Sequence, residues 1–133
     1  MSETSRTASC CCGQLSLTAV GEPSTVSMCH CFECQKRTGS LFGVQARFPD
    51  EKTEVKGEAR AYTRTGDTGK PVTFYSCPVC STTLYWQAPV LPGLTAVAVG
   101  AFGEPKFPTP HYSVYETRQH RWLKIEAEME HYD

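Results

Sequence analysis

The segment CHCFEC, residues 29–34, places three thiols within six positions of a 133-residue chain that contains eight cysteines. Two cysteine pairs flank this segment, namely Cys10 with Cys12 and Cys77 with Cys80. The two pairs together supply the four ligands of a closed tetrahedral metal site, whereas the central three leave one position open. Because structural zinc sites are closed and catalytic ones keep an open position, the pattern predicts two zinc ions per chain, one of each kind.

Composition and charge exclude several classes of partner and location for this protein. The net charge of -1 and the pI near 6.4 argue against nucleic acid or an anionic membrane surface as a partner. The first nine residues are polar and contain no apolar signal segment. The longest apolar run, residues 94–102, is too short to cross a bilayer. We therefore expect a cytoplasmic protein without membrane or nucleic-acid partners; the sequence does not indicate its oligomeric state.

The clustering of the cysteines favours metal ligation over disulfides. A disulfide framework is typical of secreted chains, and nothing in this sequence directs it to secretion. Cysteines two residues apart, such as Cys10 and Cys12, are also too close for an unstrained disulfide. Cys11 lies between these two ligands and is expected to point away from them as a small hydrophobic residue without a functional role.

Most of the sequence consists of short β-branched or aromatic segments that are typical of strands, which predicts an all-β fold with one or two short helical turns. Glycine and proline recur at roughly ten-residue intervals, the spacing of a sandwich or barrel. A helical turn is expected over residues 32–38, beginning at Cys31 and ending at Gly39, and a weaker one over 126–131. Residues 1–8 are expected to form a disordered tail before a single domain over 9–133. The expected strands are 15–20, 44–48, 53–55, 61–63, 72–75, 84–86 and 96–99.

The two flanking pairs have the spacing of a structural zinc site. Cys77 and Cys80 enclose a tight turn that aims both sulfurs to one side, and Cys10 and Cys12 share a face of an extended segment. Such a site ties the start of the chain to its middle. Binding energy at the site is also folding energy, so its loss is expected to unfold the domain.

The central cluster has the composition of a catalytic zinc site. Zinc bound by Cys29, Cys31 and Cys34 retains a position at which a thiol is deprotonated near neutral pH. His30 is a candidate proton donor, or alternatively a residue that orients the loop by a hydrogen bond. The other interpretation is a site closed by a fourth ligand, for which the candidates are His111, His120 and His131.

Three stretches of the sequence resemble the glutathione-dependent formaldehyde-activating enzyme family, which includes centromere protein V. They are SCCCG at 9–13, CHCFECQKRTGS at 29–40 and FYSCPVCSTTL at 74–84, and the segment from Pro110 to Leu123 is also similar. The chain departs from the family pattern at Cys11, a third thiol in the first motif. It departs again at Ser81, where the family usually has glycine.

The resemblance implies a zinc-tethered β-tent fold and a carbon–sulfur lyase activity that joins glutathione and formaldehyde into S-(hydroxymethyl)glutathione. It assigns the two flanking pairs to the structural zinc and the central three cysteines to the catalytic zinc. The implied partners are a small-molecule thiol and an aldehyde, although the identity of both is left open. A non-catalytic zinc scaffold or interaction module is the alternative. The candidates to bind a substrate carboxylate are Arg37, Arg47, Arg64 and Lys70.

Overall fold

Short β-branched and aromatic runs, separated by glycine and proline, form two β-sheets. The computed structural model of the chain describes residues 4–65 and 68–133. One sheet has three strands in the order β1-β2-β5, and the other has eight in the order β11-β10-β3-β4-β9-β8-β7-β6. The strands are β1 (Ser5–Ser9), β2 (Ser16–Val20), β3 (Thr25–Cys29), β4 (Gly43–Pro49), β5 (Thr53–Lys56), β6 (Arg60–Thr65), β7 (Pro71–Ser76), β8 (Thr83–Gln87), β9 (Leu94–Ala98), β10 (Tyr112–Val114) and β11 (Glu130–His131).

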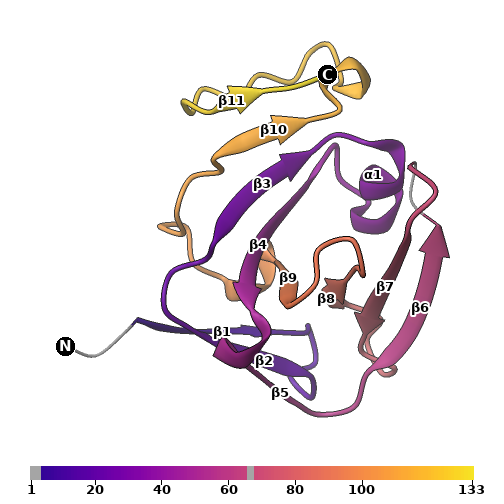
Figure 1. Cartoon of the computed structure of the whole chain (residues 1–133), viewed down its shortest axis with the longest axis vertical. Coiled ribbons are helices and arrows are strands. Elements are labelled where there is room, and N and C mark those ends of the chain that lie inside the picture. The colour runs from indigo at the N-terminus through magenta and orange to yellow at the C-terminus, as the bar shows by residue number, and fades with distance from the viewer. Residues whose placement is uncertain (1–3, 66–67) are drawn as a thin grey trace.

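The α-helix α1 (Phe32–Thr38) follows β3 directly, and three short 3₁₀ turns complete the fold: η1 (Asp50–Lys52), η2 (Val99–Phe102) and η3 (Glu116–Arg118). Figure 1 shows the three-stranded sheet at one end of the molecule and the β10–β11 pair at the other. The other strands of the eight-stranded sheet curve between these two ends of the molecule. The helix α1 lies beside the end of β3 and the start of β4. Most strand pairs are antiparallel, but β10 runs parallel to both β3 and β11.

The large sheet presents different residues on its two faces because side chains alternate along each strand. On one face, Tyr85 and Val97 pair across β8 and β9 and pack with buried Phe48 in the main core. On the other face, Phe74, Trp86 and Ala96 lie in one lateral row across β7, β8 and β9. This second face is the floor of the functional site.

The structure confirms the predicted all-β class, the helix over 32–38 and each expected strand to within two residues. Two expectations are wrong. Residues 5–8 are not a disordered tail, because they pair with β2 in β1; residues 1–3 of that tail lie outside the described residues. No helix forms over 126–131, where Glu130 and His131 extend the sheet as β11 instead.

Within the two described ranges, no helix is both long and apolar enough to span a membrane.

We expect Ala8→Asp to destabilise the protein strongly, since Ala8 has no exposed surface and lies opposite equally buried Leu17. Placing an unpaired carboxylate there should lower the free energy of unfolding by about 3 kcal/mol or more in urea denaturation. Ser5→Asp, at an exposed position of the same strand, is the control and should change it by no more than about 0.5 kcal/mol. Equal stability of the two variants would show that β1 does not contribute to the core.

Candidate metal centres and the adjoining cavity

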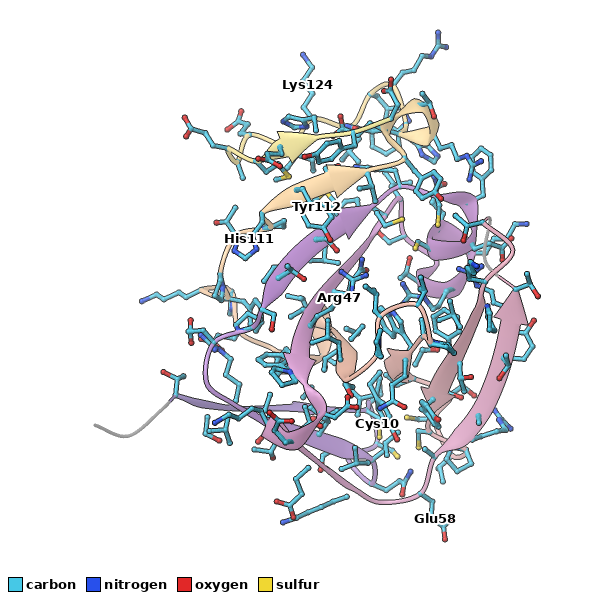
Figure 2. The ribbon with its side chains drawn as sticks, viewed as in Figure 1. Cys10, Arg47, Glu58, His111, Tyr112 and Lys124 are labelled. Atoms are coloured by element: carbon cyan, nitrogen blue, oxygen red, sulfur yellow. The ribbon has the colours of Figure 1, made fainter. Side chains whose placement is uncertain are left out.

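The two flanking cysteine pairs meet at the end of the molecule formed by the three-stranded sheet, where Figure 2 labels Cys10. Cys10 and Cys12 lie in the loop after β1, and Cys77 and Cys80 in the turn between β7 and β8. A β-bulge between Tyr75 and Ser76 precedes this turn. All four sulfurs lie within 4.8 Å of one another.

The geometry of these four sulfurs fits a tetrahedral metal ion. The distance from the Cys12 sulfur is 3.6 Å to that of Cys10 and 3.7 Å to that of Cys77. Zinc–sulfur bonds of about 2.3 Å give a tetrahedron with edges of about 3.8 Å. All four cysteines are free rather than disulfide-bonded. The backbone N–H of Leu15 donates to the Cys10 sulfur and that of Val79 to the Cys77 sulfur, as suits thiolate ligands.

Two further side chains support this cluster. The Gln14 amide donates to the Cys77 sulfur at 3.0 Å, and its other hydrogen bonds hold Glu58 beside it. Thr82 lies 3.3 Å from the Cys80 sulfur, and hydrogen bonding by Thr82 lowers the pKa of Cys80 to about 5. Cys11 lies outside the cluster, as expected, but it is exposed rather than buried as a small hydrophobic residue would be. Its backbone N–H donates to the Thr82 hydroxyl.

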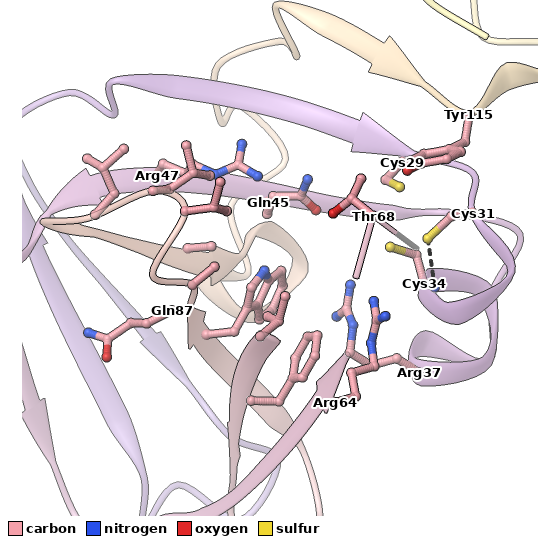
Figure 3. Close-up of a pocket in the computed structure, with 18 residues that line it drawn as sticks. Cys29, Cys31, Cys34, Arg37, Gln45, Arg47, Arg64, Thr68, Gln87 and Tyr115 are labelled. Carbon is pink, nitrogen blue, oxygen red and sulfur yellow. Dashed lines mark hydrogen bonds between the residues drawn. The ribbon is translucent and has the colours of Figure 1, made fainter. Parts of the chain in front are cut away.

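The three central cysteines converge at the opposite side of the large sheet. Cys29 ends β3, Cys31 caps α1 and Cys34 lies in its first turn. The Cys31 sulfur accepts the backbone N–H of Cys34 at 3.3 Å, which is the dashed line in Figure 3. All three are buried, and their sulfurs lie within 4.8 Å of one another.

Among residues 4–65 and 68–133, no fourth cysteine, histidine or carboxylate joins this cluster. The three histidines considered as a fourth ligand have other neighbours. His111 accepts the Val26 backbone N–H, His120 packs edge-on against Trp122, and His131 lies 2.6 Å from Glu116. The three sulfurs therefore fit a metal ion that retains an open position.

Hydrogen bonds among the three thiols shift their pKa values in different directions. Hydrogen bonds from the thiols of Cys29 and Cys34 lower the pKa of Cys31. The bond to Cys31 raises the pKa of Cys29, and burial raises it further. The three cysteines therefore influence one another's ionisation, as expected of thiols in direct contact.

His30 lies between two of these cysteines but faces away from them. Its ring is fully buried, and Nε2 lies 3.1 Å from the Ser113 hydroxyl on β10. Burial lowers the pKa of His30, and the ring does not line the cavity beside the cysteines. This placement favours the second of the two predicted roles, in which His30 orients the loop.

A cavity of about 240 Å³ adjoins the three cysteines. Its floor is the row of Phe74, Trp86 and Ala96 on the second face of the sheet. Figure 3 shows Arg37 from α1 and Arg64 from β6 side by side, with their guanidinium groups directed toward the cysteines. The Arg37 guanidinium lies 4.2 Å from the centre of the Trp86 ring, and that of Arg64 lies 5.4 Å from the Phe74 ring.

Polar groups occupy the side of the cavity formed by β4. Arg47, near the centre of the molecule in Figure 2, donates to the hydroxyls of Ser27 and Tyr112. Gln45 donates to Ser27 at 2.7 Å, but its carbonyl oxygen is buried without a partner. A buried acceptor without a hydrogen bond is costly.

Of the four predicted cation candidates, the structure brings Arg37, Arg47 and Arg64 to the cavity, whereas Lys70 is exposed and does not line it. Sequence reasoning missed Gln45 and also Tyr115, whose ring packs against the three cysteines. Tyr115 has φ of 56°, an uncommon value for a residue other than glycine. No residue pattern marked it, because β10 comes to the cluster only through its pairing with β3.

The family model for the glutathione-dependent formaldehyde-activating enzyme matches residues 5–118, which is most of the chain. The chain belongs to this family. Both cysteine clusters lie within the matched residues, and the three stretches that carry the resemblance supply all seven clustered cysteines.

Structural comparison adds support for the fold alone. The crystal structure of a Rhodobacter sphaeroides protein is similar to this member of the family, with a TM-score of 0.54 and 18% sequence identity. The match covers 71% of this chain and 85% of that one. A search of curated proteins finds none that matches this chain.

The structure explains why the formaldehyde-activating family usually has glycine where this chain has Ser81. Ser81 has φ of 67°, in the left-handed region that is unfavourable for residues with a Cβ. Its backbone N–H donates to the Cys77 carbonyl at 2.8 Å, which closes the turn around the cysteine pair.

We therefore expect Ser81→Gly to stabilise the protein. Relief of the left-handed conformation outweighs the extra chain entropy of glycine, for a net gain of about 0.5–1 kcal/mol. Urea denaturation at a fixed free zinc concentration measures the difference. Ser40→Gly, at an exposed position without a positive φ, is the control and should not stabilise. Lower stability of Ser81→Gly would contradict this account of the turn.

Proposed function

We propose that this protein is a zinc-dependent enzyme of the carbon–sulfur lyase type, which adds a small thiol such as glutathione to an aldehyde such as formaldehyde. The observation that supports it is a cluster of three buried cysteines with no fourth protein ligand among the described residues, next to a cavity of about 240 Å³. Membership of the formaldehyde-activating family supports the same chemistry. The four-cysteine cluster is proposed to hold a second, structural zinc.

The reaction balances without an oxidant or reductant. The thiol sulfur forms a bond to the aldehyde carbon, the C=O π electrons move to oxygen, and that oxygen takes up the proton that the thiol loses. Cys29, Cys31 and Cys34 would hold the zinc ion, which would supply the positive charge that lowers the pKa of a bound thiol and polarises a carbonyl oxygen.

The residues of the chain would bind the substrates and hold the developing charge. Arg37 and Arg64 place two positive charges beside the cysteines, where they favour the thiolate over the thiol. The apolar floor of Phe74 and Trp86 lowers the polarity next to the cysteines, which strengthens these interactions.

His30 is proposed as a positioning residue rather than a proton donor. Its bond to Ser113 attaches the loop between Cys29 and Cys31 to β10. The half-buried Gln35 side chain adds a second attachment by donating to the His30 carbonyl at 2.8 Å and to the Arg118 carbonyl. These contacts fix the directions of the cysteine side chains before a metal binds.

Cys77→Ser should remove one zinc ion per chain and leave the protein unfolded or nearly so at 25 °C. Structural zinc sites contribute about 10 kcal/mol or more, comparable with the whole stability of a small domain. Metal content by mass spectrometry of the intact protein and circular dichroism measure the two effects. Cys11→Ser is the matched control, because Cys11 is exposed and outside the cluster, and should keep both metals and the wild-type melting temperature. A Cys77→Ser protein that melts like the wild type with one metal fewer would contradict the structural role.

Cys34→Ser should abolish the acceleration of exchange between glutathione and its hydroxymethyl adduct. Two-dimensional NMR exchange spectroscopy measures the rate, and zinc-loaded wild type and Cys11→Ser should both accelerate it at least about tenfold. The Cys34→Ser protein should retain the four-cysteine metal and the wild-type fold.

Absence of acceleration by the wild type, with both zinc ions present, would argue against glutathione–formaldehyde chemistry. Cobalt substitution then separates the remaining interpretations. A change of the cobalt absorption on addition of a thiol indicates an open site that acts on other substrates, whereas no change indicates a scaffold with two closed sites.

A further inference from the structure

A second cavity, of about 410 Å³, lies between α1 and the edge strand β6. It shares three lining residues, Arg37, Arg64 and Phe74, with the cavity beside the cysteines. We call the second cavity the basic groove, because Arg60, Lys36, Arg37 and Arg64 line it and Glu33 is its one carboxylate among the described residues.

The alternation of β6 builds this groove. Arg60, Tyr62 and Arg64 lie two residues apart and share one face of the strand. Tyr62 pairs with Phe74 on β7, so the groove continues the lateral row that forms the floor of the first cavity. The two cavities are therefore neighbouring parts of one surface, separated by the side chains of Arg37 and Arg64.

Arg37 and Arg64, which separate the two cavities, pack against aromatic rings rather than against carboxylates. Arg37 lies over both Trp86 and Phe74, and no ion pair joins Arg37 or Arg64 to a carboxylate in residues 4–65 and 68–133. The absence of a side chain at Gly43 leaves room for Arg37, since a Cβ at this position would come within 2.9 Å of the guanidinium. Two adjacent cations without an acid partner indicate a site that receives negative charge from a bound molecule.

The four cations that line the basic groove differ in the negative charge available to balance them. A zinc ion with three thiolates and a bound substrate thiolate would have a net charge of about -2, which Arg37 and Arg64 would balance. In the basic groove, Glu33 lies 3.7 Å from Lys36 and balances it. Arg60 then remains as the cation of the groove to which no described carboxylate is paired.

We propose that the basic groove binds a carboxylate carried by the thiol substrate, with Arg60 as its charge partner, and that the protein thereby selects acidic thiols over neutral ones. This specificity rests on the proposed function, in which the thiol of the same molecule lies at the open metal position. Arg60 is a specificity-determining residue in this scheme, because it lines only the groove and not the cavity beside the cysteines.

The test compares three thiols on the cobalt-substituted protein, with absorption at the metal reporting binding. Glutathione carries two carboxylates, its dimethyl ester has the same framework without them, and 2-mercaptoethanol tests the metal position alone. The wild type should bind glutathione about tenfold more tightly than the ester. Arg60→Gln should reduce this preference about fivefold while leaving the affinity for 2-mercaptoethanol unchanged. Arg121→Gln, which removes an exposed charge outside both cavities, should keep the preference.

Equal affinity of the wild type for glutathione and the ester would overturn the proposed groove, as would an unchanged preference in Arg60→Gln. Either result would leave the thiol site itself intact, because 2-mercaptoethanol reports on it separately. Failure of all three thiols to change the cobalt absorption would instead overturn the proposed function and the role of the groove with it. Because Arg60 is exposed, both arginine variants are expected to fold, and circular dichroism checks this.

Discussion

The convergence of four cysteine sulfurs at one end of the molecule is the constraint on which the remaining structure depends. The contact between the sulfurs of Cys12 and Cys77 joins residues 65 positions apart. It brings the small sheet, which contains β1 and β2, against the turn between β7 and β8. Closing so long a loop is entropically costly, and a metal ion is an efficient means of offsetting that cost in a chain of 133 residues. Leu15 and Leu17 lie in the same core cluster as Phe48 and Val97 of the large sheet.

The candidate functional site lies on the face of the large sheet that does not pack against the main core. Tyr75 and Tyr85 stack at 4.6 Å on the core face, while their neighbours Phe74 and Trp86 contact each other on the other face. Alternation along β7 and β8 thus gives the chain a hydrophobic interior and a ligand-sized hollow from the same two strands. The three central cysteines lie at the edge of this hollow because β3 ends and α1 begins there.

Much of this arrangement could be predicted from the sequence, because its main determinants are local. The thiol spacing identified both clusters, and the glycine at position 39 ended the predicted helix where the structure ends it. Pairing between distant strands was not predictable in the same way. The role of Ala8 depends on its partner Leu17, and the position of Tyr115 depends on the parallel pairing of β10 with β3. The cavity itself was also missed, since Trp86 and Arg37 meet only in three dimensions.

The division of the sheet into two faces has a consequence for how this protein can diversify. Positions that differ by one along β7 and β8 contribute either to folding stability or to the shape of the hollow, but rarely to both. Substitutions at Phe74 or Trp86 can therefore alter which molecules fit, while Tyr75 and Tyr85 continue to pack in the core. Such a layout separates, at the scale of single residues, the side chains that stabilise the fold from those that shape the hollow, so the hollow can change while the fold is retained.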